Sequence, residues 1–234
     1  KSVSAAIVAL SWSPLIFLET FGSVGGVTVT GIVSFSPFWF QDVFLPNVNI
    51  VPIGNDFLYN SIKANGLIKL QKGILIISAN FFGKKILNFI KKNDFQKKTR
   101  NIPIFFKLHP NQFDEKEYYI ENLREFENIR VISNEYSVSD LIEKCDTIFT
   151  IISTTIYEAL QSKRKVILLK EHPYKDHEHI FDRKNLHLVD TVEDFISALD
   201  TEIVIDQDIT FFAPFDKEAF FKALWVNCWN NRPY

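Results

Sequence analysis

Polar residues that could bind a phosphate or transfer a proton follow several short apolar runs of this sequence. Asn80, His109 and a Ser-Thr-Thr run at residues 153–155 each begin two residues beyond the end of such a run. If the apolar runs are parallel strands, their carboxyl ends meet at one edge of a sheet, where open α/β proteins bind their ligands. The spacing therefore predicts a single ligand site built from residues far apart in the chain.

The Ser-Thr-Thr run has two interpretations. Hydroxyls and unpaired backbone N–H groups at the start of a helix favour an anion such as a phosphate. Thr155-x-x-Glu158 also has the pattern of a capping box, which satisfies a helix end without any ligand, and Thr191-x-x-Asp194 nearly repeats it at an expected structural site. We favour phosphate binding because Ser153 and Thr154 add hydroxyls that a cap does not require.

His109 is the candidate for acid–base chemistry. A histidine at a strand end, beside Lys107, can hold a phosphate oxygen or protonate a leaving group near neutral pH, whereas a buried histidine is often only structural. Pro110 stiffens the turn that presents it. We expect a catalytic role for His109, and phosphate binding by Lys107, His109, Pro110, Asn80 and residues 153–155.

Several other classes of site are not supported. Residues 172–179 contain three histidines and two acids, but their spacing matches no metal-ligand pattern, so we expect a metal-independent site. The sequence has no Gly-x-Gly-x-x-Gly and no Walker loop, which counts against NAD enzymes and P-loop ATPases. It has no Gly-x-Ser-x-Gly elbow for a hydrolase triad either.

The elements that position these residues alternate between strand and helix. Continuously apolar runs, typical of strands covered on both faces, lie at residues 73–78, 102–107, 129–132, 147–151, 165–169 and 186–189. Amphipathic stretches lie between and after them at residues 84–93, 115–126, 139–145, 155–161 and 191–199. This alternation predicts an α/β fold with an open parallel sheet and helices on both faces, Rossmann-like in type.

The chain divides into three predicted parts. Residues 1–70 are a partial N-terminal α/β segment, residues 73–200 the Rossmann-like domain that carries the candidate ligand site, and residues 201–234 a helical extension with an aromatic helix at 215–228. Within the first part, strands are expected at residues 5–10, 27–35 and 49–53. Residues 3–18 are apolar but too short for a membrane span, and are predicted as a buried strand followed by a helix.

Composition limits the class of protein. The chain has 234 residues, 47% of them hydrophobic, and a net charge of −2, so no nucleic-acid partner is expected. The basic clusters between residues 84 and 100 are interpreted as a solvated helix face rather than a polyanion or membrane patch. Two distant cysteines indicate a reduced, cytoplasmic protein, and a chain without Met is expected to be a fragment or a processed product.

Two motifs follow predicted strands in a fixed order. The first is Lys-x-His-Pro, and the second, after a later strand, is Ser-Thr-Thr-x-x-Glu-Ala-Leu, which precedes a Lys-Val-Ile strand. The combination resembles the C-terminal, donor-binding domain of GT-B-fold transferases of bacterial surface and capsular polysaccharides. Similar proteins include CDP-glycerol glycerophosphotransferases and bacterial polysialyltransferases. The resemblance covers residues 73–199 and implies that His109 with Pro110, and residues 153–155, bind the phosphates of a nucleotide-activated donor. It also implies that Glu158 lies near the ribose or sugar.

The expected function is therefore a glycosyltransferase that uses a CMP-, CDP- or UDP-linked sugar and no further cofactor. Its acceptor would be a glycan or glycolipid. The protein is expected in the cytoplasm, where it could also associate peripherally with the inner face of the membrane. Glu19 and Asp42 are candidates for the acceptor's base only because they are acidic. Alternatives are a nucleotide-sugar 2-epimerase of the same fold, and a non-catalytic nucleotide-binding or scaffolding module.

Overall fold

A computed structural model describes residues 5–9, 15–20, 30–34, 49–52, 54–67, 72–204 and 210–222. The chain forms two compact units. One unit consists of Lys1–Ser61 with Thr210–Tyr234, and the other of Ile62–Ile209, which contains the residues predicted to bind the donor.

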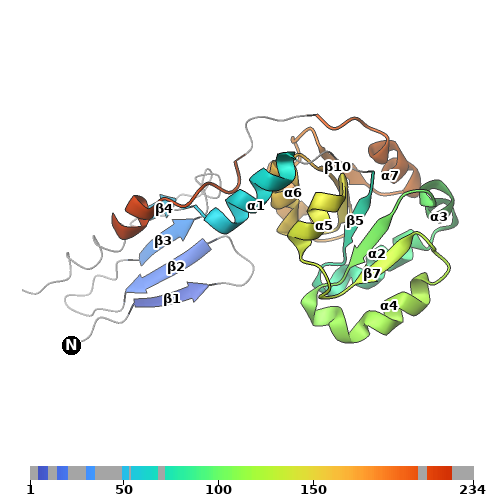
Figure 1. Ribbon diagram of the computed structural model, residues 1–234, viewed down its shortest axis with the longest axis horizontal. Coiled ribbons are helices and arrows are strands. Elements are labelled where there is room, and N and C mark those ends of the chain that lie inside the picture. The colour runs from blue at the N-terminus through green and yellow to red at the C-terminus, as the bar shows by residue number, and fades with distance from the viewer. Residues whose placement is uncertain are drawn as a thin grey trace, which may run out of the picture. The chain divides into compact units, whose positions relative to one another are not determined.

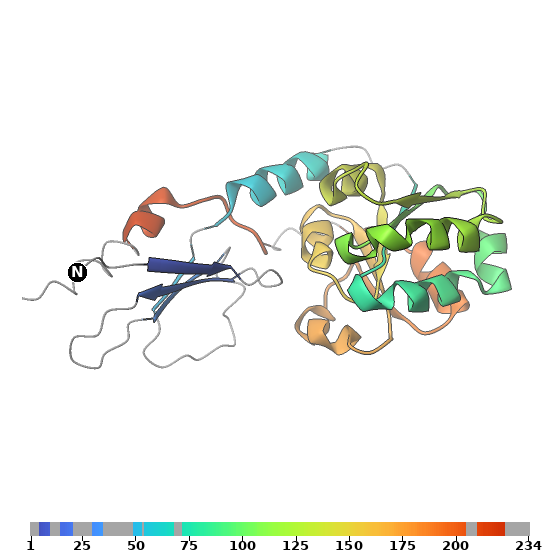
Figure 2. The same cartoon turned by 90° about the horizontal axis from the view of Figure 1, so that it is seen from below.

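The larger unit is built on a parallel sheet of six strands (Figures 1 and 2). The strands are β5 (Ile74–Ile77), β6 (Ile104–Lys107), β7 (Ile129–Ile132), β8 (Thr147–Thr150), β9 (Lys165–Leu169) and β10 (Leu186–Val189). Their order across the sheet is β10-β9-β8-β5-β6-β7, and each neighbouring pair is parallel. This is the doubly wound arrangement of Rossmann-like domains, so the fold class predicted from the strand–helix alternation is confirmed.

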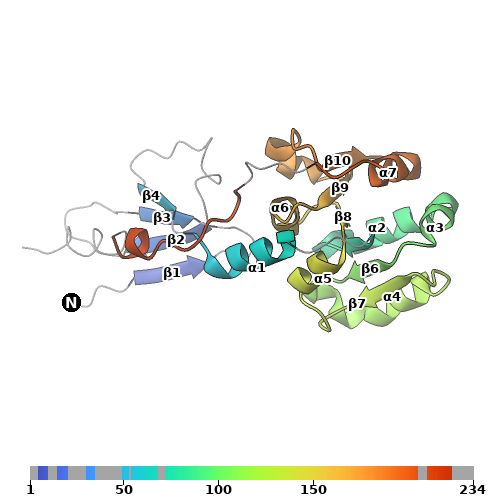
Figure 3. The same cartoon turned by 45° about the horizontal axis from the view of Figure 1, so that its top comes forward.

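Helices cover both faces of this sheet (Figure 3). On one face lie α2 (Gly83–Ile90), α3 (Asn93–Thr99), α4 (Lys116–Leu123) and α7 (Val192–Leu199), and on the other α5 (Val138–Lys144) and α6 (Thr155–Gln161). Three 3-10 helices, η2 (Asn80–Phe82), η3 (Pro110–Glu115) and η4 (Tyr174–Ile180), follow β5, β6 and β9. Each predicted apolar or amphipathic run contains one of these elements or begins within two residues of it. Helix α3 was not predicted, because a loop was expected after the amphipathic stretch at residues 84–93.

The core on the first face is aromatic. Phe89 of α2, Phe95 of α3, Phe149 of β8 and Phe195 of α7 are buried, with ring centroids 4.9 to 6.1 Å apart. Burying such rings is the main favourable term for a domain of this size. The packing explains why α7, the last helix of the unit, returns to the face that carries α2 and α3.

The smaller unit holds a four-stranded sheet of order β1-β2-β3-β4, with strands Ala5–Ala9, Leu15–Thr20, Thr30–Ser34 and Asn49–Pro52. β1 and β2 are antiparallel, as are β2 and β3. The helix predicted toward residue 18 is therefore wrong, because residues 15–20 form a strand. The sequence there, LIFLET, contains β-branched and aromatic residues that favour a strand over a helix.

The end of the described chain returns to this unit. Asn55 N–H donates to the Ala213 carbonyl at 2.9 Å, and Phe215 N–H donates to the Asp56 carboxylate at 2.8 Å, where α1 (Asp56–Leu67) begins. Gly54 has φ of 71°, and a Cβ there would lie 1.9 Å from the Pro214 carbonyl oxygen, so only glycine fits. Residues 217–222 are helical, and the rest of the predicted aromatic helix lies outside the described residues.

Candidate functional site

The strand order places the candidate site at the centre of the sheet. β5 runs between β6 and β8, and the chain goes first toward β7 and later, from β8 on, toward β10. The reversal between β5 and β8 is the point at which open α/β sheets bind ligands, outside the carboxyl ends of the strands. The loops after β5, β6 and β8 all begin at this edge. They carry Asn80, His109 and residues 153–155, which are the residues expected in the site.

A buried hydroxyl joins the loops after β5 and β6. Ser78, directly after β5, donates to the Gln112 side-chain oxygen and accepts the backbone N–H of His109 at 2.9 Å. Gln112 in turn donates its amide to the Tyr119 hydroxyl of α4 at 3.0 Å. Ser78, Gln112 and Tyr119 are 0%, 6% and 0% exposed, so water does not replace these bonds. The His109 turn is therefore held at a defined position on the sheet edge.

Gly83, the first residue of α2, leaves the room that this network needs. A Cβ at Gly83 would lie 2.3 Å from the Tyr119 hydroxyl oxygen and 2.6 Å from the Gln112 amide nitrogen. Burial raises the pKa of Tyr119 to about 12, so its hydroxyl stays protonated at neutral pH. On the other side of β5, the buried Thr150 hydroxyl donates to the Ile77 carbonyl at 3.0 Å and joins the end of β8 to the end of β5.

The hydrogen bonds of His109 define its tautomer. Nδ1 accepts the backbone N–H of Asn111 at 3.2 Å, so the proton of the neutral ring lies on Nε2. Burial lowers the pKa of the half-buried ring, which favours this neutral form at neutral pH. A neutral Nε2–H can donate a hydrogen bond to a phosphate oxygen. Phosphate binding and protonation of a leaving group by His109 both stay predictions.

Asn80 lies next to this turn. Its side-chain oxygen accepts from the Asn111 side-chain amide at 3.3 Å, which links η2 after β5 to η3 after β6. Ala79, just before it, has a positive φ of 43°, a conformation that is costly for a residue with a side chain. The structure therefore brings Asn80, His109 and Asn111 together, as the strand-end hypothesis predicts for the first two.

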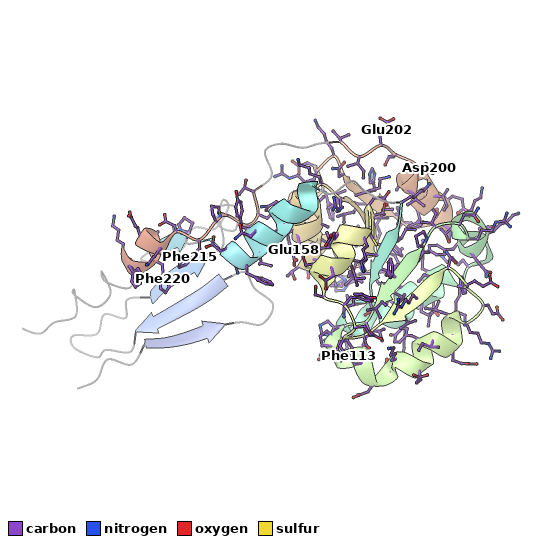
Figure 4. The ribbon with its side chains drawn as sticks, viewed as in Figure 1. Phe113, Glu158, Asp200, Glu202, Phe215 and Phe220 are labelled. Atoms are coloured by element: carbon purple, nitrogen blue, oxygen red, sulfur yellow. The ribbon has the colours of Figure 1, made fainter. Side chains whose placement is uncertain are left out.

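Lys107 has a different environment from the one expected. Its ammonium donates to the Ser133 carbonyl at the end of β7 and lies 5.2 Å from the centre of the Phe113 ring, which Figure 4 labels. The side chain is 8% exposed, and burial lowers its pKa although the Glu135 carboxylate opposes that effect. Its described contacts thus join the ends of β6 and β7. Pro110 is exposed and opens η3 directly after His109.

The start of α6 does not form the capping box that its sequence allows. Thr154 occupies the N-cap position and makes no side-chain capping bond, while Thr155 is buried. By contrast, complete capping boxes form at Ser137 with Asp140 and at Thr191 with Asp194. The expectation that the Ser153 hydroxyl is not needed at the helix start is wrong, because this hydroxyl accepts the backbone N–H of Thr155 at 3.2 Å. The exposed Thr154 hydroxyl makes no bond with the described residues.

Glu158, labelled in Figure 4, lies one turn further along α6. Burial raises its pKa to about 7, and none of the described residues gives its carboxylate a hydrogen bond or an ion pair. A carboxylate without a partner is costly to bury, and a hydroxyl-bearing ligand would offset that cost. The predicted role of Glu158 beside a ribose or sugar stays a prediction.

The histidines after β9 are occupied by other contacts. The Tyr157 hydroxyl lies 3.0 Å from His177 Nδ1 and 3.0 Å from His179 Nε2. Within the described ranges, no group of three or more histidine, cysteine or acidic side chains could hold a metal ion. Glu19 has only its backbone described and Asp42 lies outside the described residues, so neither can be assessed as a base.

The buried residues whose hydrogen bonds hold the loops of the site were not predicted from the sequence. Ser78, Gln112 and Thr150 were not singled out, although Ser78 and Thr150 are hydroxyl residues that end apolar strands. A hydroxyl in that position has to find a partner when it is buried, and this signal could have identified both. Gln112 has no comparable signal, because only the fold places its side chain beside Ser78.

Residues 82–186, somewhat less than half of the chain, match the family described as capsule polysaccharide biosynthesis protein. The match contains the His109 turn and the run at residues 153–155. It supports the glycosyltransferase-like function that the sequence predicts, without identifying the donor or the transferred group. No curated protein matches the sequence.

Solved structures are similar to the chain at low identity. The UDP-GlcNAc 2-epimerase of Methanocaldococcus jannaschii, solved with UDP-GlcNAc and UDP, is 15% identical, with a TM-score of 0.51, over 77% of this chain and 55% of its own. The wall teichoic acid polymerase TagF is 15% identical over 84% and 57%, with a TM-score of 0.45. HepE of Anabaena, solved with UDP and glucose, is 11% identical over 82% and 58%, with a TM-score of 0.43.

The chain thus spans just over half the length of the structures it resembles. The first of these likenesses agrees with the parallel sheet described above and shows the fold. No helix among the described residues is long and apolar enough to cross a membrane. The resemblance predicted from the sequence is therefore confirmed: residues 82–186 are similar to capsule polysaccharide biosynthesis proteins, on a Rossmann-like domain of the GT-B type.

Proposed function

We propose that this chain contains the donor-binding half of a glycosyltransferase of surface polysaccharide synthesis. The observation that carries the proposal is the family match over residues 82–186, which contains both motifs that the fold brings to the carboxyl edge of the sheet. The expected donor is a sugar linked to UDP, CDP or CMP. UDP is the first probe because the similar epimerase and HepE were solved with it.

The residues support specific roles for the donor's groups. His109, with its proton on Nε2, would donate to a phosphate oxygen, and the Asn80 and Asn111 amides lie beside it. The exposed Thr154 hydroxyl would add a further donor, and Glu158 would accept from a ribose or sugar hydroxyl. Neutral donors held in place in this way stabilise the charge that develops on a leaving nucleotide phosphate.

Lysines near this edge are already engaged. Lys85 pairs with Glu171 at 2.7 Å and Lys170 with Asp190 at 2.8 Å, while Lys84 lies 3.8 Å from Glu115. A phosphate arriving at the edge would compete with carboxylates for these ammonium groups. The proposal therefore assigns phosphate recognition to hydrogen-bond donors rather than to a dedicated lysine.

Binding is tested by thermal unfolding with UDP, CDP and CMP, since a ligand of the folded state raises the melting temperature with its concentration. We expect a rise with at least one nucleotide, smaller for His109→Ala. Unchanged melting with all three at millimolar concentration would contradict the proposal.

The second candidate, a nucleotide-sugar 2-epimerase, is favoured by the solved structure with the TM-score of 0.51. It needs no acceptor, so incubation of a UDP-sugar alone separates the two activities. An epimerised nucleotide sugar identifies the epimerase, whereas a transferase leaves the sugar's configuration unchanged until an acceptor is added. Binding without turnover under either condition would instead indicate a non-catalytic binding module.

A further inference from the structure

A cluster of three ring side chains lies beside the candidate site. Tyr157 belongs to α6, and His177 and His179 belong to η4, the 3-10 helix after β9. The Tyr157 hydroxyl is 3.0 Å from a ring nitrogen of each histidine, and the Tyr157 ring stacks on that of His179 with centroids 5.9 Å apart. Tyr157 and His177 are buried, at 4% and 6% exposed, whereas His179 is exposed to solvent.

The cluster is connected to the backbone of the predicted phosphate site. His177 Nε2 accepts the backbone N–H of Ser153 in a long bond of 3.4 Å. Because Nε2 is the acceptor, the proton of the neutral ring lies on Nδ1 and is donated to the Tyr157 oxygen. The Tyr157 hydroxyl hydrogen is then directed at His179 Nε2. One directed chain of hydrogen bonds therefore runs from Ser153, after β8, to η4.

This chain requires His177 to be neutral. Burial, with a smaller effect of His179, lowers the pKa of His177 to about 4, and Asp176 opposes the shift only in part. The ring is therefore uncharged at neutral pH and can accept from Ser153. A charged ring would carry protons on both nitrogens and could not accept this bond.

We infer that His177 and Tyr157 are positioning residues of the donor site, which hold the Ser153 turn against the loop after β9. The inference rests on the proposed function, since it assumes that the donor's phosphates bind at residues 153–155. Unlike a cluster that only fills the core, this one contacts the main chain of the predicted binding loop. Neither residue needs to touch the donor.

Matched substitutions separate the two bonds of His177. In His177→Gln, the terminal amide stands near the position of Nε2 and can still accept from Ser153. In His177→Asn, the shorter amide stands near Nδ1 and can donate to Tyr157 but cannot reach Ser153. Tyr157→Phe removes the hydroxyl that joins the histidines and keeps the ring. His187→Gln and His187→Asn are controls on β10, where His187 lies 3.2 Å from the Thr201 hydroxyl.

Two readouts test the inference. Hydrogen exchange of the Ser153 amide, followed by NMR, should be fastest in His177→Asn, which loses the bond to Ser153. Tyr157→Phe and His177→Gln, which lose only the bond between residues 157 and 177, should show a smaller increase over the wild type. The dissociation constant for UDP, CDP or CMP, whichever the wild type binds most tightly, should rise roughly twofold to tenfold in His177→Asn, the effect of one lost hydrogen bond, and less in the other two variants. Both His187 variants should match the wild type.

The outcomes are distinguishable. Unchanged Ser153 exchange in both His177→Asn and Tyr157→Phe overturns the inference, as does faster exchange with unchanged nucleotide affinity. Equal increases in Ser153 exchange and equal losses of nucleotide affinity in His177→Gln and His177→Asn also overturn the inference, because they indicate a general packing defect. A wild type that binds none of the nucleotides removes the proposed function, and the positioning role falls with it.

Discussion

Ser78→Ala should both destabilise the fold and weaken nucleotide binding. The substitution removes the hydroxyl that donates to Gln112 and accepts from His109 N–H, so the buried amide oxygen and the backbone N–H each lose this hydrogen bond. At about 0.5 to 1.5 kcal/mol for each net hydrogen bond, the loss amounts to about 1 to 3 kcal/mol. For a chain of this size, each kcal/mol lowers the melting temperature by roughly 2 to 4 °C.

Calorimetry and nucleotide titration of the same preparation measure both effects. Thr99→Ala is the matched control, because the buried Thr99 hydroxyl donates to the Phe95 carbonyl within α3 and far from the His109 turn. The control should lose stability without losing affinity. Ser78→Ala should lose both, since the His109 turn is no longer held. A Ser78→Ala protein that melts like the wild type refutes the buried network, and one that binds nucleotide normally removes the His109 turn from the site.

Three further outcomes follow from the described contacts. Thr191→Ala should lower the free energy of unfolding, measured by chemical denaturation, by about 1 kcal/mol, because the capping box of Thr191 is formed. Thr154→Ala should change this free energy little and instead weaken nucleotide binding, because Thr154 makes no capping bond. Equal losses of unfolding free energy in the two variants would contradict this contrast. Gly83→Ala should lower the melting temperature, because its Cβ would lie 2.3 Å from the Tyr119 hydroxyl oxygen; unchanged melting would show that α2 can shift freely. Burial raises the pKa of Glu158 from 4.5 to about 7 in the folded protein. Between these two pH values the folded protein binds more protons than the unfolded chain, so the free energy of unfolding falls as the pH rises from 4.5 to 7. Glu158→Gln should flatten this decline in melting temperature between pH 5 and pH 8, and an unchanged slope would assign the decline to other groups.

Much of the larger unit could be predicted from the sequence because its strands are buried on both faces. Continuously apolar runs such as KVILL indicate covered strands, and the amphipathic stretches that alternate with them indicate the covering helices. Parallel strands then bring their carboxyl ends to one edge, so Asn80 and His109 could be placed together without knowing the strand order.

Other features depend on contacts that no local pattern encodes. The letters Thr-x-x-Glu and Thr-x-x-Asp are nearly alike, yet only Thr191 forms its box, because α6 begins with Thr154 in a helical conformation. The direction of the Lys107 side chain depends on the Ser133 carbonyl at the end of a neighbouring strand. The residues at 15–20 themselves favour a strand, but the pairing with β1 and β3 that fixes this strand in the sheet depends on distant residues.

The central claim is that a nucleotide binds at the carboxyl edge of β5, β6 and β8, and a backbone-amide NMR titration tests it most directly. Adding UDP, CDP or CMP to the labelled chain should shift the amides of residues 78–82, 108–109, 111–112 and 151–155 together, with one common dissociation constant. The amides of residues 91–100, at the opposite edge of the sheet, should stay in place. Shifts confined to that opposite edge, or no shifts with any of the three nucleotides, would contradict the account.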